Sequence, residues 1–296
     1  HHGKPPRCAE ALIAAGISRV VSAVTDPEAR VSGRGHAMLR AAGIAVETLE
    51  IAPRGPQYDR RWMVVDADGR FVTARQYSEM VLIRAEAQVM GLRLSAPGLP
   101  DLDVGHPLSG SSRLRVLIWK DTIGAAVVDP AADAWLSAFL QRPVRLVYMD
   151  DRARRAADPA YAQPGDEVSF ADGYPLLVIS QAALDDLNAR LADAGRAAVV
   201  MAQFRPNLVV DDAVAHAEDD WKRLRIGTVE FDAVKVCTRC VFTTVDPVSG
   251  TRRADGEPLN TLKAYRRTPN GITFGMNLIP RGTGTLRIGD AVTLLG

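Results

Sequence analysis

From residue 49 onward the chain is a series of short β-prone segments separated by turn signals, and this pattern restricts the fold more than any other feature of the sequence. The segments are rich in Val, Ile, Leu and aromatic residues, and glycine, proline and aspartate interrupt them at close spacing. Such spacing leaves little room for the crossover helices of a parallel sheet, so it predicts a β-sandwich or a barrel. The predicted strands are Leu49–Ala52, Arg61–Asp66, Arg70–Thr73, Val81–Val89, Leu92–Ser95, Arg113–Ile118, Gly124–Val128, Leu176–Ile179, Leu208–Val210, Leu224–Ile226, Val229–Phe231, Val241–Val245, Gly271–Asn277 and Thr285–Leu295.

Two segments between the predicted strands have the apolar spacing of helices. Asp129–Leu140 places Ala132, Trp135 and Leu136 on one face. Gln181–Leu191 follows Ser180, whose hydroxyl suits the N-cap position of a helix. We therefore expect a mainly β fold with a few helices.

A charged stretch, Asp150–Asp172, interrupts the β-rich part of the chain. It contains two prolines and reads as a long loop or linker. A length of 296 residues suits about two domains at roughly 150 residues each. We expect one domain at residues 48–150 and another at residues 151–296, preceded by a short α/β segment at residues 1–47.

The charge balance and the cysteine count narrow the classes of protein to which the chain can belong. The 36 Lys and Arg residues nearly cancel the 35 Asp and Glu residues, which argues against broad electrostatic binding of nucleic acid or of an anionic membrane. The apolar stretches fall short of the ~20 residues that a membrane-spanning helix needs. Three cysteines cannot form a disulfide framework, and two of them share one Cys-x-x-Cys, so we expect a reducing compartment, the cytoplasm.

The segment Cys237-Thr238-Arg239-Cys240 is the most informative one for chemistry. A thioredoxin-like motif opens a helix, whereas a strongly β-prone Val-Phe-Thr-Thr-Val follows here. A structural zinc site needs four ligands, but there is no second Cys-x-x-Cys or paired histidine, and His216 and Cys8 are remote in the sequence. Both of these interpretations are disfavoured.

Two interpretations of the cysteine pair remain open on residue chemistry alone. One cysteine can supply a single thiolate ligand to a soft metal or to a metal carried by a cofactor. The neighbouring cations Arg239 and Lys235 would favour the ionised thiol. The alternative is that both cysteines are buried at the start of a strand and chemically inert.

Seven ordered blocks of residues, the Cys-x-x-Cys among them, resemble the MOSC family, which is named for the C-terminal domain of molybdenum-cofactor sulfurase. The resemblance covers about residues 49–296 and, within the family, is most similar to bacterial relatives of the mitochondrial amidoxime-reducing component. It implies a MOSC β-barrel domain preceded by the family's N-terminal β-barrel module. The blocks are Gly55–Trp62, Val72–Gln76, Phe204–Asn207, Ala217–Trp221, Cys237–Cys240, Phe274–Asn277 and Ile288–Asp290.

The resemblance also implies a site for the molybdenum cofactor. In the family, a pterin dithiolene and one protein cysteine hold the metal, and that cysteine corresponds to Cys240, the expected metal ligand and catalytic residue. Arginine offers a planar fork of donors to phosphate and pterin edges, and asparagine both donates and accepts. The residues expected to bind the pterin and its phosphate are Arg60, Arg205, Asn207, Thr238 and Arg239.

The activity that the resemblance implies is reduction of N-hydroxylated compounds such as hydroxylaminopurines and amidoximes. A separate donor protein of the ferredoxin or cytochrome type is expected to supply the electrons, because the chain has no four-cysteine signature of a plant-type iron–sulfur domain. The family is also associated with pyridoxal phosphate binding. The alternative function is a non-catalytic module that binds or carries the molybdenum cofactor.

The N-terminal segment departs from the family pattern. The family's first strand carries Tyr-Pro-x-Lys-Ser, whose Lys and Ser help to bind the cofactor phosphate, and nothing before Leu49 matches it, which favours the carrier alternative. Residues 1–46 instead resemble a fragment of the riboflavin-biosynthesis pyrimidine deaminase, with Cys8 as the last of three zinc ligands. The other two ligands and the glutamate proton shuttle would precede His1, so we do not expect this segment alone to bind zinc or deaminate. A remnant deaminase is the less favoured enzyme.

Overall fold

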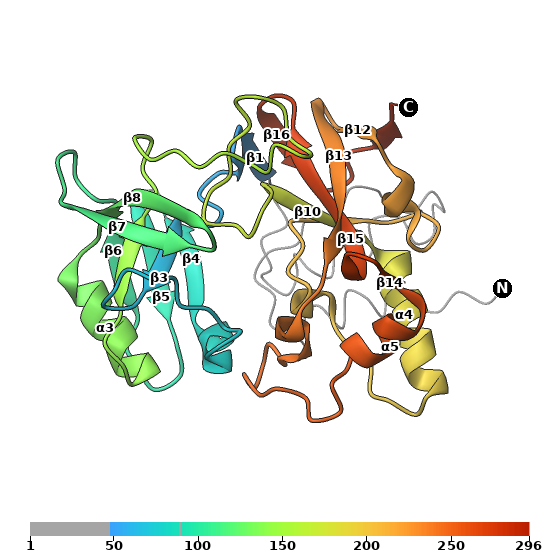
Figure 1. Ribbon diagram of the computed structural model, residues 1–296, viewed down its shortest axis with the longest axis horizontal. Coiled ribbons are helices and arrows are strands. Elements are labelled where there is room, and N and C mark those ends of the chain that lie inside the picture. The colour runs from blue at the N-terminus through green and yellow to red at the C-terminus, as the bar shows by residue number, and fades with distance from the viewer. Residues whose placement is uncertain (1–47, 89, 296) are drawn as a thin grey trace. The chain divides into compact units, whose positions relative to one another are not determined.

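The computed structural model describes residues 48–88 and 90–295 (Figure 1). The α/β segment expected at residues 1–47, which includes Cys8, lies outside the described residues. The described chain forms two compact units, each built from separate stretches. Unit 1 comprises residues 48–57, 175–239 and 260–295, and unit 2 comprises residues 58–174 and 240–259. The predicted domain ranges, 48–150 and 151–296, stay a prediction.

The prediction of a mainly β fold is confirmed. In the described residues, a nearly closed barrel-shaped sheet is accompanied by smaller antiparallel sheets and three helices. The barrel-shaped sheet belongs to unit 1 and has seven strands, ordered β11-β10-β15-β13-β12-β17, with β14 paired to β15. These strands are β10 (Leu176–Ser180), β11 (Leu208–Val210), β12 (Arg223–Ile226), β13 (Val229–Thr238), β14 (Arg267–Thr268), β15 (Gly271–Pro280) and β17 (Val292–Leu294).

Unit 1 also contains a three-stranded sheet and most of the helical residues. Its strand order is β16-β1-β2, with bounds Gly284–Arg287, Thr48–Ala52 and Gly55–Pro56. Helix α4 spans Gln181–Asp193, and helix α5 spans Leu259–Tyr265, of which all but the first residue belong to unit 1.

Strand β10 is buried on both faces, which explains its continuous run of apolar residues. Leu176 and Val178 face one core cluster, which also holds Phe231. Leu177 and Ile179 face a second cluster that α4 and α5 help to build. Because successive side chains of a strand point to opposite faces, only an unbroken apolar segment suits this position.

Unit 2 combines a four-stranded and a three-stranded antiparallel sheet with one helix. The first sheet has the order β3-β9-β8-β7, with bounds Trp62–Val65, Arg145–Tyr148, Asp121–Val127 and Arg113–Ile118. The second has the order β4-β5-β6, with bounds Arg84–Gln88, Gly91–Ser95 and Leu102–Gly105. Helix α3 (Pro130–Leu140) begins after Asp129, whose side chain accepts a hydrogen bond from Ala131 N, and it buries Trp135 and Leu136.

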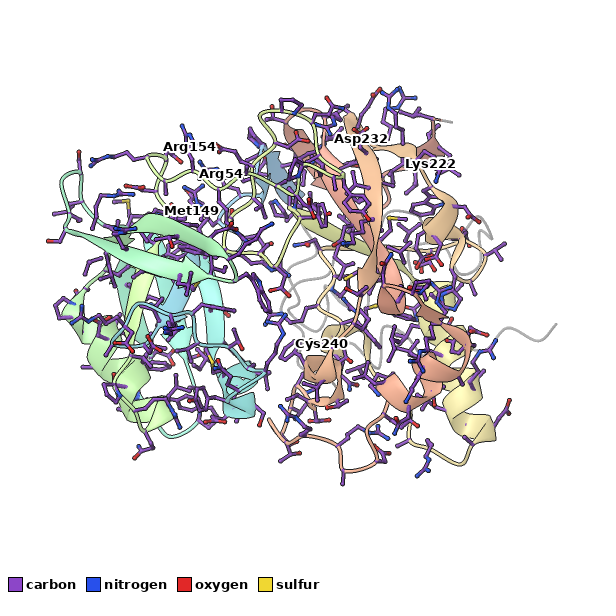
Figure 2. All side chains as sticks on the ribbon, viewed as in Figure 1. Arg54, Met149, Arg154, Lys222, Asp232 and Cys240 are labelled. Atoms are coloured by element: carbon purple, nitrogen blue, oxygen red, sulfur yellow. The ribbon has the colours of Figure 1, made fainter. Side chains whose placement is uncertain are left out.

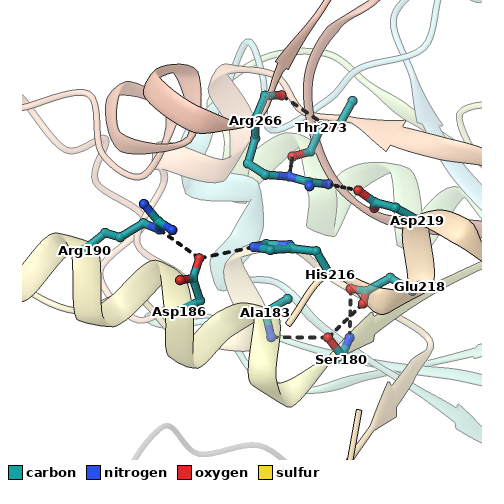
Figure 3. A network of polar contacts seen from close by, with 9 residues as sticks. All are labelled: Ser180, Ala183, Asp186, Arg190, His216, Glu218, Asp219, Arg266 and Thr273. Carbon is teal, nitrogen blue, oxygen red and sulfur yellow. Dashed lines mark hydrogen bonds and ion pairs between the residues drawn. The ribbon is translucent and has the colours of Figure 1, made fainter. Parts of the chain in front are cut away.

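A network of polar side chains in unit 1 fixes the start of α4 (Figure 3). The N-cap Ser180 accepts a hydrogen bond from Ala183 N at 3.2 Å, as its position in the sequence predicts. The fully buried Glu218 accepts from the hydroxyl of Ser180 at 2.8 Å and from its backbone N–H at 3.1 Å. Glu218 therefore orients the capping hydroxyl and satisfies a buried backbone donor.

Replacing Glu218 is expected to destabilise unit 1. Glu218→Ala leaves the Ser180 N–H buried without an acceptor, which costs about 1–3 kcal/mol. Urea denaturation measures the loss. Glu218→Gln keeps one acceptor, so its free energy of unfolding should fall less. Asp220→Ala, at an exposed position, should leave the free energy of unfolding almost unchanged. Equal midpoints for Glu218→Ala and Asp220→Ala would contradict this role.

A second part of the same network makes stability depend on pH. Asp186 accepts hydrogen bonds from Arg190 at 2.8 Å and from His216 at 3.3 Å (Figure 3). The Arg190 contact, above all, lowers the pKa of Asp186, although burial opposes this shift. The stabilisation is therefore complete above the ordinary carboxyl pKa of ~3.9 and is lost as pH falls through the lower pKa of the folded state.

Asp186→Asn removes this pH-dependent contribution. The free energy of unfolding, measured between about pH 6 and pH 3, should fall less steeply in Asp186→Asn than in the wild type. Arg190→Gln removes the principal donor and should flatten the profile in the same direction. Identical slopes in all three proteins would show that the contact is not the source of the pKa shift.

Candidate functional site

Cys240 lies at a corner where the chain leaves β13 and enters a short 3₁₀ turn, Val241–Thr244 (Figure 2). The predicted strand Val241–Val245 is therefore wrong. Two threonine side chains bond to the backbone of this turn, Thr243 Oγ1 to Cys240 O at 3.0 Å and Thr244 Oγ1 to Val241 O at 2.7 Å. Local side-chain bonds of this kind compete with a strand ladder, and here they outweigh the β-propensity of the sequence.

A charged guanidinium contacts the sulfur of Cys240. Arg75 Nε donates a hydrogen bond to Cys240 Sγ at 3.3 Å, within unit 2. The other end of the same guanidinium pairs with Asp172. The guanidinium carbon of Arg75 lies 4.9 Å from the ring centroid of Trp119. Burial opposes the charge on Arg75, but Asp172 and Cys240 outweigh it and raise the pKa of Arg75 above its ordinary value. The sulfur is thus held against a fixed positive charge.

Arg75 was not among the predicted site residues. It belongs to the block Val72–Gln76, which carried the family resemblance, and that block was the only signal in the sequence that could have found it. The backbone of Arg75 is also held in place, because Arg252 donates a hydrogen bond to the Arg75 carbonyl at 2.9 Å.

Arg239 contacts Cys237, the first cysteine of the pair. Its Nη1 donates to Cys237 Sγ at 3.1 Å and its Nη2 donates to Phe204 O at 2.7 Å, within unit 1. The guanidinium also lies over the Phe204 ring, 5.2 Å from its centroid. Arg239 Nε is buried and has no hydrogen-bond partner among the described residues. A buried N–H donor of this kind is unfavourable unless a ligand or water satisfies it.

Arg205 and Asn207 lie between a 3₁₀ turn (Met201–Gln203) and strand β11. Arg205 has a φ of 53°, a left-handed conformation that is uncommon for a residue with a side chain. Asn207 Oδ1 accepts from Leu177 N at 3.0 Å, and Asn207 N donates to Leu177 O at 2.9 Å. Asn207 therefore has a structural function, because it joins the start of β11 to β10.

Arg60 and Thr238 complete the set of predicted residues. Arg60 pairs with the adjacent Asp59, has a φ of 50° and is half-buried in unit 2. Thr238 is exposed at the end of β13, where it pairs with Thr273 of β15. Arg60 and Cys240 belong to unit 2, and the other predicted residues, Arg205, Asn207, Thr238 and Arg239, belong to unit 1. The assignment of these side chains to a cofactor stays a prediction.

The part of the chain that the structure describes contains no preformed metal cage of protein side chains. Within residues 48–88 and 90–295, no group of three or more His, Cys, Asp or Glu side chains is placed to hold a metal ion. His216, considered above as a zinc ligand, contacts Asp186. In the same residues, no helix is both long and apolar enough to cross a membrane.

Comparison with known proteins decides the family. Residues 40–143 match the MOSC N-terminal beta barrel domain and residues 165–293 match the MOSC domain. The chain is 35% identical over 274 residues to mitochondrial amidoxime-reducing component 1 of Danio rerio, an alignment that covers 87% of this chain and 82% of that protein. The chain belongs to the MOSC family.

Two mammalian proteins show the same relationship. Mitochondrial amidoxime-reducing component 1 of Homo sapiens is 34% identical over 252 residues, covering 80% of this chain and 73% of that protein. Mitochondrial amidoxime reducing component 2 of Rattus norvegicus is 37% identical over 254 residues, with the same two coverages, 80% and 73%. The predicted membership of the MOSC family and the homology to amidoxime-reducing components are confirmed.

The contact between Arg75 and Cys240 in this MOSC protein can be measured by a double-mutant cycle. Arg75→Gln and Cys240→Ala each remove the hydrogen bond, so their effects on the free energy of unfolding should be non-additive by about 1 kcal/mol. As a control, Arg75→Gln is combined with Asp103→Asn, because Asp103 pairs with Arg93 through exposed side chains. That pair should be additive, and additivity of the Arg75 and Cys240 variants would show that the contact has no energetic weight.

Proposed function

We propose that this MOSC protein is a molybdenum-cofactor-dependent oxidoreductase that reduces N-hydroxylated compounds, with Cys240 as the protein ligand to the metal. The observation that carries the proposal is the contact of Cys240 with Arg75, in a chain about one-third identical to amidoxime-reducing components over most of its length. A cysteine sulfur suits a soft, cofactor-borne metal, and the Arg75 guanidinium lies within hydrogen-bond distance of the Cys240 sulfur.

The described side chains fit the chemistry of the cofactor's anionic and polar edges. Arginine presents two parallel N–H donors to a phosphate, and the candidate residues Arg60 and Arg205 are of this type. Both have left-handed backbone, which is concentrated at functional sites in proteins. Among the described residues, the buried Nε of Arg239 has no hydrogen-bond partner, and it is a donor of the kind that a bound polar group would satisfy.

The proposed reaction is a two-electron reduction, R–NH–OH + 2 e⁻ + 2 H⁺ → R–NH₂ + H₂O. The bound cofactor supplies the metal that changes oxidation state, and a separate donor protein of the ferredoxin or cytochrome type supplies the electrons. This chain's own residues position the reacting centre, because Arg75, fixed by Asp172 and by the backbone bond from Arg252, holds the sulfur of Cys240 in one place.

Metal analysis of two matched variants tests the proposal. We expect molybdenum in the purified wild type and its loss in Cys240→Ser. Cys237→Ser should retain the metal, because Cys237 is not the proposed ligand. The hydroxyl of the introduced serine can still accept the hydrogen bond from Arg239. Equal retention in both variants would refute Cys240 as the ligand.

A second measurement separates a reductase from a cofactor carrier. The molybdenum-loaded protein, given a chemically reduced dye as electron donor, should convert an N-hydroxylated base to the amine, and Cys240→Ser should not. A loaded wild type that performs no reduction would instead identify the protein as a binding or carrier module.

A further inference from the structure

Trp119 occupies a position in unit 2 that the fold does not require to be aromatic. Strands β7 and β8 are joined by a two-residue loop, Trp119-Lys120, because Ile118 pairs with Asp121. Two-residue hairpin loops need positive φ at the first central residue and strongly favour Asn, Asp or Gly there. Trp119 has a φ of 54°, so a bulky residue adopts a conformation that disfavours it.

Core packing does not explain this choice, since 46% of the Trp119 surface is exposed. Its ring is nevertheless ordered by two neighbours. The ring of Phe71 lies at a centroid distance of 5.0 Å and is tilted by 56°. The guanidinium carbon of Arg75 lies 4.9 Å from the Trp119 centroid. The turn thus displays a large aromatic surface whose orientation is already fixed.

Arg75 connects this aromatic surface to Cys240. The same guanidinium that lies over Trp119 donates its Nε hydrogen to Cys240 Sγ at 3.3 Å. The Trp119 ring centroid is therefore within about 10 Å of the sulfur, given the short C–N bonds of the guanidinium. Val241, next to Cys240 in the chain, is also exposed. Trp119 and Val241 are thus two exposed apolar side chains near the proposed reacting centre.

We infer that Trp119 is a stacking platform for the substrate and makes the protein selective for N-hydroxyl groups carried on planar aromatic rings over those carried on aliphatic chains. The inference rests on the proposed function. Flat π-systems stack on an exposed indole whatever their hydrogen-bonding pattern, and a purine offers such a face whereas an aliphatic amidoxime does not. Arg75 strengthens the platform because it holds the ring in place from one side.

Substitution at Trp119 tests the platform without harming the fold. Trp119→Asn removes the ring and introduces a residue that tolerates positive φ, so the free energy of unfolding should not fall. Trp119→Phe keeps an aromatic face. Both variants and the wild type are loaded with cofactor and assayed with a reduced dye on an N-hydroxylated purine and on an aliphatic amidoxime.

The expected result is a change confined to the planar substrate. Trp119→Asn should raise KM for the purine about tenfold, the effect of losing one base–aromatic stack, with kcat changed less than about twofold. KM for the aliphatic amidoxime should stay the same, and Trp119→Phe should lie close to the wild type. Equal rises in KM for both substrates, or a change only in KM for the electron donor, would overturn the inference.

Binding without turnover provides a second readout. The purine should quench tryptophan fluorescence in the wild type, and Trp119→Asn should lose that quenching although three of the four tryptophans remain. Quenching that is the same in both proteins overturns the platform. A wild type that reduces neither substrate, yet shows Trp119-dependent quenching, refutes the proposed function and supports the platform.

Discussion

The sheet of unit 1 is built around the antiparallel pairing of two ten-residue strands, β13 and β15. The candidate cysteine segment lies at the end of β13. The pairing shifts register twice, between Ala233 and Lys235 and again between Val236 and Thr238. The side chain of Asn277 donates to Lys235 O at 2.9 Å, so a backbone acceptor beside the first irregularity is satisfied. Gly275 has a φ of 81°, and a Cβ there would lie 2.6 Å from Ile179 Cγ1, so glycine is needed for β10 to pack against β15.

Left-handed backbone at residues other than glycine is another feature that constrains the sequence of this fold. Arg60, Arg205 and Trp119 all have this conformation, and their side chains are half-buried or exposed. Each such residue destabilises the folded chain by roughly 1–3 kcal/mol. At Trp119 the two-residue hairpin loop itself requires this conformation, and the feature that the turn does not require is the bulk of the side chain.

Much of the fold could be predicted because single segments decide their own structure. The apolar run of β10 suits only a strand buried on both faces, and Asp129 and Ser180 mark the starts of α3 and α4 by their capping chemistry. Prediction failed where a local interaction opposed propensity, as at Val241–Val245, where threonine hydroxyls bond to the backbone. It also missed β9 (Arg145–Tyr148), whose four residues depend on pairing with the distant strands β3 and β8.

The site shows why neighbours in the sequence are poor guides to neighbours in space. Arg239 directly precedes Cys240, so the sequence favours it as the cation that acts on that sulfur, yet its guanidinium contacts Cys237 and Phe204. Cys240 receives its hydrogen bond from Arg75, which is 165 residues away in the chain. The two cysteines thus have different cations with different anchors. Arg239 is held by a backbone carbonyl and an aromatic ring, whereas Arg75 is held by the carboxylate of Asp172. Because each sulfur contacts its own cation, substitution of one cysteine leaves the contact of the other intact. The chemistry proposed for Cys240 can therefore be separated experimentally from the contact between Cys237 and Arg239.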